Sequence, residues 1–311
     1  DTEFPWPGII FGSFIIGFWY WCTDQYIVQR VLSAKGIKEA RRGTMFAGYL
    51  KLLPIFIFLV PGMIAYALKA KGIISYDSAD QAFPTLVAEL LPSGVKGIVI
   101  GGLVAALMSS LASLFNSSAT LFTIDFYKKF KPESSEKHLL KVGRLATVAI
   151  VILGLLWIPI MSLIADVLYE YLQSVQSLIA PGIAAVFLLG LCSKRITPAA
   201  GFAGLVSGFV LGMIRLVLLP FKDNLAGSSF AWITDMNWLY YCILLFVVVV
   251  VLMIVVSIFT KPASNEQLKG LTFSSLDKAT LKEVAAGLDK WDYIHTAGII
   301  GITAFIYYRF W

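Results

Sequence analysis

The sequence has few charged residues, three cysteines and two histidines, and each shortage argues against a class of protein. Of 311 residues, 14% are charged and 58% hydrophobic, and the mean hydropathy is +0.80, so a soluble domain would lack polar surface. Cys22, Cys192 and Cys242 have no metal-binding or redox spacing, and we predict that they pack within helices. No nucleophile is paired with a base, which argues against an enzyme.

Long apolar segments dominate the sequence. An α-helix needs about 20 apolar residues to cross the hydrocarbon core of a membrane, whereas membrane β-strands alternate apolar and polar residues, which Phe246 to Val256 do not. We therefore predict an all-α membrane protein, because a helix satisfies its own backbone polar groups in lipid. The eight predicted membrane helices span residues 8–29, 43–68, 95–124, 143–165, 167–192, 198–220, 238–260 and 293–310.

The charges lie mostly in the predicted loops. A formal charge of +6 could indicate nucleic-acid binding, but eighteen of the 25 lysine and arginine residues fall on one side of the predicted membrane. This asymmetry predicts that side to be cytoplasmic. In the outer segment 69–94, the stretch 83–91 predicts a short surface helix. The chain starts at Asp1 without a leader-like segment, so we expect a longer parent protein.

Polar side chains inside a membrane helix need a physical reason, because a central charge costs about 2.5–3.5 kcal/mol on insertion scales. In the first helix, the aromatic run 19–21 precedes the polar run 23–25, and Gly8, Gly12 and Gly17 are predicted to loosen the outer half. These features fit an interfacial aromatic belt. They also fit rings that stack on a sugar beside a break in the helix.

Two other helices carry isolated hydrogen-bonding side chains. Lys51 either extends toward the membrane surface or donates to ligand hydroxyl groups, with Asp24 or Gln25 as a neighbour. Gln173 of the fifth helix either pairs with another helix or binds a sugar hydroxyl, since an amide both donates and accepts. Pro181 predicts a bend near the middle of that helix.

The third predicted helix carries a face of small polar residues. Their spacing of three and four residues is typical of close helix packing. The hydroxyl oxygens of Ser109 and Ser110, together with the carbonyl of Ala106, also form a suitable ligand set for sodium, without any carboxylate. The recurring polar residues are Ser109, Ser113, Asn116, Ser117 and Thr120.

Several segments together resemble the sodium/glucose cotransporter branch of the sodium:solute symporter family. They are FPWPGIIFG, GFWYWCTDQYIVQR, GYLKLLPIFIFLVPGMI, ALMSSLASLFNSSATLFTIDFY and APGIAAVFLLGL. The resemblance implies a five-plus-five inverted-repeat (LeuT-like) fold, with this chain beginning at the second repeat. Residues 1–192 would then form that repeat and 193–311 the peripheral C-terminal helices, and the N-terminal half of the transporter would be missing.

The resemblance also assigns roles to individual residues. Tyr20 is expected to be the inner gate beneath the sugar and Trp21 its aromatic neighbour, while Lys51 and Gln173 are expected to bind sugar hydroxyls. Tyr169 is similar to an outer-gate aromatic residue. The sodium site would include Ala106, Ser109 and Ser110.

The implied function is sodium-coupled symport of a monosaccharide, glucose or galactose, across the cytoplasmic membrane, with no nucleic-acid partner. Gly17 stands where relatives that bind glucose or galactose often have a polar residue near the sugar, so a symporter for myo-inositol or sialic acid is an alternative. A sugar-gated sensor of the same fold is a second alternative. Ala112 replaces a hydroxyl residue associated with a second sodium ion, which favours one sodium per sugar. The outer loop lacks the cysteines of animal members, which predicts a bacterial protein located in the inner membrane.

Overall fold

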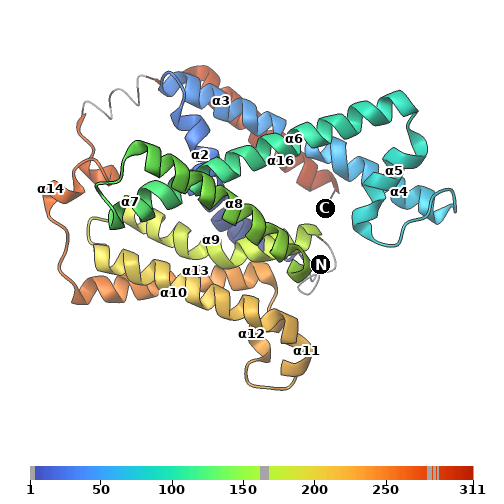
Figure 1. The fold of residues 1–311 in the computed structure, drawn as a ribbon. Helices are drawn as coiled ribbons and strands as arrows, with labels where there is room; N and C mark the ends of the chain where they lie inside the picture. Colours follow the sequence, from blue (N-terminus) through green and yellow to red (C-terminus); the bar gives the residue numbers. More distant parts are fainter. Residues whose placement is uncertain (1–3, 162–167, 279–281, 283–284, 286, 311) are drawn as a thin grey trace. The chain divides into compact units, whose positions relative to one another are not determined.

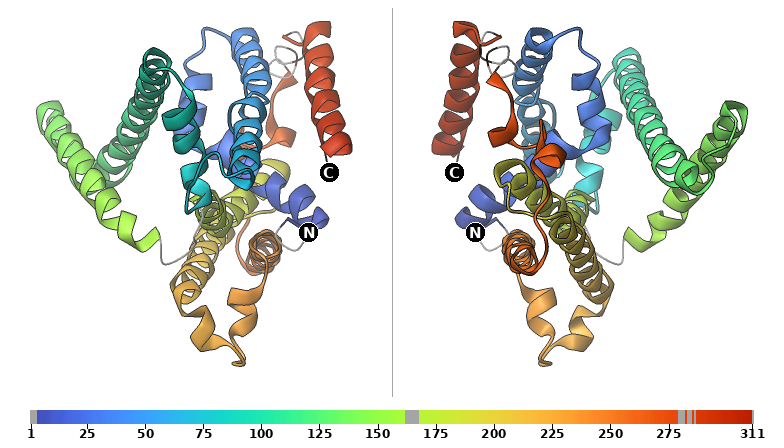
Figure 2. Two further views of the ribbon diagram at one scale, coloured as in Figure 1. Left: turned by 90° about the vertical axis from the view of Figure 1, so that its right-hand side faces the viewer. Right: turned by 90° about the vertical axis from the view of Figure 1, so that its left-hand side faces the viewer.

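The computed structural model describes residues 4–161, 168–278, 282, 285 and 287–310. Within them every regular element is helical (Figures 1 and 2), which confirms the predicted all-α class. The chain forms two compact units, Asp1–Ala40 with Tyr169–Trp291 and Arg41–Leu168 with Asp292–Trp311. Their boundaries do not coincide with residue 192. Because symmetry rather than contact defines a repeat, the division at that residue stays a prediction.

Unit 1, residues 1–40 and 169–291, is built around three long helices, of which α10 and α13 lie side by side (Figure 1). Side-chain caps set where two of them begin. Thr197 Oγ1 accepts a hydrogen bond from the Ala200 amide at 3.2 Å, and Asn237 Oδ1 accepts one from the Leu239 amide at 2.9 Å. The elements are η1 (Gly8–Gly12), α1 (Ser13–Phe18), η2 (Trp19–Thr23), α2 (Gln25–Leu32), α9 (Leu168–Cys192), α10 (Pro198–Leu218), η6 (Leu219–Phe221), α11 (Lys222–Leu225), α12 (Ala231–Asp235), α13 (Trp238–Phe259), α14 (Asn265–Leu268) and η7 (Phe273–Ser275).

Glycines bring the backbones of α9 and α10 into contact. Gly204, Gly208 and Gly212 recur every four residues and so share one face of α10. A Cβ added at Gly208 would lie 2.7 Å from the Cα of Gly182, closer than real Cβ atoms approach. A Cβ at Gly212 would meet the backbone of Leu178. This is the small-residue packing by which membrane helices associate without a hydrophobic driving force.

The first helix packs against α13 and α9. A Cβ at Gly8 or Gly12 would lie within about 3 Å of Leu239, and the Cys242 thiol lies 3.8 Å from the Gly12 carbonyl oxygen. These two glycines therefore permit close packing, and the break in this helix lies further along, at Asp24. The buried cluster at this contact consists of Ile15, Ile16, Ala180, Ala184 and Cys242.

Arg215 of α10 is 2% exposed and joins α10 to the start of α13. Its guanidinium carbon lies 4.2 Å from the centroid of the Tyr241 ring, and its Nη2 donates to the Met236 carbonyl at 2.5 Å. The Tyr241 hydroxyl donates back to the Leu211 carbonyl of α10 at 3.1 Å. A cation–π contact and two hydrogen bonds thus fix the α10–α13 hairpin at its turn.

Unit 2, residues 41–168 and 292–311, contains two local assemblies. The short helix α5 packs on α4 around Ala65, Ile74 and Leu86, which confirms the surface helix predicted over 83–91. The long helix α8 returns along α6 after the short α7 (Figure 2). The elements are α3 (Ile37–Leu50), η3 (Ile55–Leu59), α4 (Val60–Ala70), η4 (Ala79–Gln81), α5 (Ala82–Leu90), α6 (Ser93–Thr120), η5 (Leu121–Tyr127), α7 (Lys128–Phe130), α8 (Glu136–Met161) and α16 (Lys290–Phe310).

Within the described residues, six helical stretches are long and apolar enough to cross a membrane, and each overlaps one of the eight predicted spans. Gly8–Thr23 is apolar but shorter, and α16 is helical over the eighth predicted span without being among the six. Residues 162–165 and 167 of two predicted spans lie outside the described residues. The six are Ile37–Ala70, Ser93–Phe130, Glu136–Met161, Leu168–Cys192, Pro198–Leu225 and Trp238–Phe259.

Candidate functional site

The first helix is interrupted directly after its aromatic run. Tyr20 and Trp21 lie in the π-helical turn η2, and at Asp24 the backbone becomes extended, with φ −73° and ψ 118°. The Asp24 carboxylate then caps α2 by accepting a hydrogen bond from the Tyr26 amide at 3.0 Å. Thr23 Oγ1 donates to the Trp19 carbonyl at 2.7 Å and so satisfies an oxygen before the break.

The two predicted sugar-binding aromatics are neighbours in this turn. The centroids of Tyr20 and Trp21 are 5.2 Å apart with their ring planes at 88°, an edge-to-face arrangement. Tyr20 is half-buried, whereas Trp21 is 44% exposed. An exposed indole face next to a helix break is a surface on which an apolar sugar face can stack.

Tyr169 and Gln173 stand one turn apart on α9 and contact each other. Gln173 Nε2 donates to the Tyr169 hydroxyl at 3.3 Å, which leaves the amide oxygen available as an acceptor. α1 packs against Ala180, two turns beyond Gln173, and thus about 10 Å further along α9. α9 continues as a helix through Pro181.

Lys51 lies at a second helix interruption, in unit 2. Pro54 has no amide hydrogen, so the Leu50 carbonyl accepts a tighter hydrogen bond from the Leu53 amide at 3.1 Å instead. α3 therefore ends at Leu50, and the chain makes a turn over residues 51–53 before η3. The Lys51 side chain is exposed. Asp24 and Gln25, its predicted neighbours, belong to unit 1, so their pairing with Lys51 stays a prediction.

The predicted sodium ligands lie together on α6. Ala106 and Ser110 are four residues apart with Ser109 between them, so the three share one exposed side of the helix. The hydroxyls of Ser117 and Thr120 donate to carbonyls four residues earlier, at 2.9 and 2.7 Å. Ser109 and Ser110 make no such donation among the described residues, so their hydroxyl oxygens remain available to a cation.

Sequence reasoning predicted a break in the first helix but not its position at Asp24, and it did not predict the interruption before Pro54. It located flexibility at glycines, whereas the observed breaks are at Asp24 and just before Pro54. Both helix interruptions have a recognisable signal in the sequence. Asp before a run of helix-forming residues is a typical N-cap, and a proline inside an apolar run removes one backbone hydrogen bond.

Comparison with known proteins decides the family. The family model described as "Sodium:solute symporter family" matches residues 1–208. The chain belongs to the sodium:solute symporter family. With six apolar helices of membrane-crossing length in the part that the structure describes, this symporter-family chain is a multi-pass membrane protein. Membership points to a transporter rather than an enzyme.

Three similar proteins carry names that describe sodium cotransport of glucose or myo-inositol. Sodium/glucose cotransporter 4 of Mus musculus is 40% identical over 291 residues, covering 88% of this chain and 42% of that protein. Sodium/glucose cotransporter 1 of Ovis aries is 39% identical, with 88% of this chain and 44% of that protein covered. Sodium/myo-inositol cotransporter 2 of Bos taurus is 40% identical, with 91% and 45% covered. This symporter-family chain thus spans less than half the length of these relatives.

Proposed function

We propose that this chain is the second half of a sodium-coupled monosaccharide symporter, with glucose or galactose as the substrate. The observation that carries the proposal is about 40% identity over 88% of the chain to proteins named sodium/glucose cotransporters. Their names describe cotransport, which favours a transporter over a sugar-gated sensor. Myo-inositol is the second candidate substrate, because a sodium/myo-inositol cotransporter is equally similar.

In this proposal the sugar binds beside the interrupted helices. Trp21 offers an exposed ring face, Tyr20 closes the site toward the cytoplasm, and Tyr169 is the aromatic residue of the outer gate. The amide of Gln173 and the ammonium of Lys51 bind hydroxyl groups of the sugar. Helix interruptions support this assignment, since they are where transporters of this architecture place substrate and ion sites.

The sodium ion is the co-substrate and binds to the side of α6 formed by Ala106, Ser109 and Ser110. The hydroxyls of Ser109 and Ser110 support this role because neither donates a hydrogen bond among the described residues. The Ala106 carbonyl oxygen can also bind a cation, because it has a second lone pair. The remaining oxygen ligands would come from the part of the transporter that this chain does not contain. No titratable ligand is needed, so we expect sodium binding to depend little on pH.

Coupling follows from differential affinity. Sodium stabilises the conformation in which the outer sugar site is formed, and by linkage the sugar raises the affinity for sodium. An inward-moving cation gains about 2.3 kcal/mol per 100 mV of membrane potential, in addition to its concentration gradient. These two sources of free energy drive the sugar inward without covalent chemistry.

The finer architecture is part of the same proposal. Residues 1–192 form the second inverted repeat of a LeuT-like fold, and 193–311 form peripheral helices. Eight segments cross the membrane, including the interrupted first helix and α16, whose apolar residues cover the predicted eighth span. The expected location is the plasma membrane, the inner membrane of a bacterium.

The test is uptake of labelled glucose, galactose and myo-inositol into proteoliposomes that contain the full-length transporter. We expect uptake with an inward sodium gradient, little uptake when potassium replaces sodium, and at least tenfold less uptake in Gln173→Ala. Asn224→Ala is the matched control, because Asn224 is an exposed amide on α11 outside the proposed site. Uptake that is indifferent to sodium, or a Gln173→Ala variant equal to Asn224→Ala, would overturn the proposal.

A further inference from the structure

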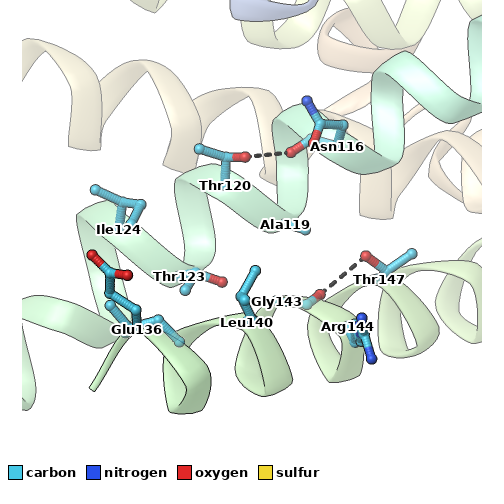
Figure 3. Close-up of a pocket in the computed structure, with 11 residues that line it drawn as sticks. Asn116, Ala119, Thr120, Thr123, Ile124, Glu136, Leu140, Gly143, Arg144 and Thr147 are labelled. Atoms are coloured by element: carbon cyan, nitrogen blue, oxygen red, sulfur yellow. Dashed lines mark hydrogen bonds between the residues drawn. The ribbon is translucent and has the colours of Figure 1, made fainter. Parts of the chain in front are cut away.

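A groove of about 540 Å³ lies between two helices of unit 2 (Figure 3). One wall is the end of α6 with η5, and the other is the first half of α8. These are the ends that the charge asymmetry predicts to be cytoplasmic. Polar groups on the walls are Asn116, Thr120, Thr123, Glu136, Arg144 and Thr147.

Arg144 is the cation of this groove. It is exposed, it belongs to the apolar helix Glu136–Met161, and it has no hydrogen-bond or ion-pair partner among the described residues. Glu136 lies eight residues earlier on the same helix, about 12 Å along its axis, and forms no ion pair with Arg144. Charged side chains in membrane helices normally face a protein interior and pair there, because an unpaired charge is expensive in lipid.

Thr123 is a second unsatisfied group on the opposite wall. It is 5% exposed, and its hydroxyl oxygen is buried without a hydrogen-bond partner in the described part of the chain. Figure 3 shows it facing α8, where Gly143 permits the approach: a Cβ at Gly143 would lie 3.4 Å from Thr123 Oγ1. A buried hydroxyl without a partner costs about 1–3 kcal/mol, and this one lies at the contact between α6 and α8.

Two of the other polar side chains in the groove already donate hydrogen bonds within their own helices. The hydroxyls of Thr120 and Thr147 donate to the Asn116 and Gly143 carbonyls at 2.7 and 3.0 Å. The groove therefore presents the Arg144 guanidinium and the Asn116 amide as donors, neither with a partner among the described residues. An acceptor-only, negatively charged group is the complementary ligand, and a carboxylate fits a guanidinium in bidentate geometry.

We propose that this groove docks a membrane helix from the part of the transporter that precedes this chain in its relatives, and that a carboxylate on this helix pairs with Arg144. The relatives supply the missing length, since the chain covers 42–45% of them and corresponds to their second half.

The extent of the groove favours a protein helix over a lipid headgroup. Asn116 lies seven residues before Thr123 on α6, and Thr123 faces Gly143, the neighbour of Arg144, so the Asn116 amide is about 10 Å further from the predicted cytoplasmic end than Arg144. The headgroup layer of one leaflet is only about 5–8 Å thick. A lipid that placed its phosphate at Arg144 would thus leave the Asn116 amide against acyl chains, whereas a polar helix face can satisfy both groups.

Disulfide crosslinking tests docking without relying on transport. In the full-length transporter with its native cysteines replaced, Thr147→Cys is combined with single cysteines along each helix of the preceding part and oxidised. We expect crosslinks to positions on one face of one helix, because a disulfide forms only where Cα atoms come within about 7 Å. Leu153→Cys, exposed on another side of α8, is the control and should not crosslink to those positions. A groove cysteine that crosslinks to no helix and reacts with a lipid-phase maleimide would overturn the proposal in favour of lipid.

Charge exchange tests the carboxylate. We expect Arg144→Glu to lower the yield of monodisperse transporter at least tenfold, and one Asp→Arg or Glu→Arg change on the crosslinked helix to restore at least half of it. Arg195→Glu, at an exposed position outside the groove, should leave the yield unchanged. A normal yield of Arg144→Glu, or no rescue by any exchange, would refute the pairing. Yield and crosslinking do not depend on the substrate, so this result stands apart from that of the proposed function.

Discussion

Gly208→Ala should destabilise the transporter by forcing α9 and α10 apart. The added Cβ would lie 2.7 Å from the Gly182 Cα, whereas carbon atoms attract best at about 3.5–4.0 Å. The helices must therefore separate locally by about 1 Å. The Gly182 Cα is a backbone atom and the position of a Cβ is fixed by its own backbone, so no side-chain rotation can relieve the contact. Overpacking of this kind costs about 1–3 kcal/mol.

The measurement is thermal unfolding of the purified transporter in detergent, followed by tryptophan fluorescence. At about 2–4 °C per kcal/mol, a scale taken from soluble domains of 150–250 residues, the midpoint should fall by several degrees. Gly190→Ala is the matched control on α9, because nothing lies within 4 Å of its added Cβ. Alanine there should be neutral or stabilise the helix by up to about 1 kcal/mol. Equal midpoints for the two variants would show that α9 and α10 do not meet through Gly182 and Gly208.

Two further predictions concern the proposed sites. Asp24→Ala removes the cap of α2 and should lower the free energy of unfolding by about 0.5–2 kcal/mol, while Asp24→Asn keeps a capping oxygen and should lose only a few tenths; equal losses in thermal unfolding would contradict the capping role. Ser109→Ala should raise the sodium concentration that gives half-maximal uptake at least threefold, because one cation ligand is lost. Ser118→Ala, on the opposite side of α6, is its control, and a similar rise in both variants would count against the sodium assignment.

Much of the fold could be read from the sequence, because membrane helices are specified by length and hydropathy. Six predicted spans coincide with apolar helices, and the surface helix near Leu86 was predicted from its half-apolar pattern between prolines. The break at Asp24 was missed because glycines drew the interpretation toward the outer half. Gly8 and Gly12 instead permit contact with Leu239, a residue more than two hundred positions away, which no local pattern reveals.

The candidate sites were likewise only partly predictable from the sequence. Ala106, Ser109 and Ser110 share a side of α6 because helical periodicity alone determines it. The partners of Lys51 were not predictable, since they depend on how separate helices assemble. The groove beside Arg144 was equally hidden, because the burial of Thr123 depends on a glycine twenty residues further along the chain.

The two incomplete polar sites of α6 have a common explanation. The sodium side at Ser109 and the groove wall at Thr123 are fourteen residues apart on one continuous helical run, about 21 Å along its axis. Each presents oxygen or nitrogen groups without partners among the described residues, in a segment apolar enough to lie in lipid. Lipid satisfies neither, because hydrocarbon offers no hydrogen bonds or ligands. A preceding half that supplies sodium ligands at one level and a carboxylate for Arg144 of α8 at the other would therefore satisfy polar groups on both helices.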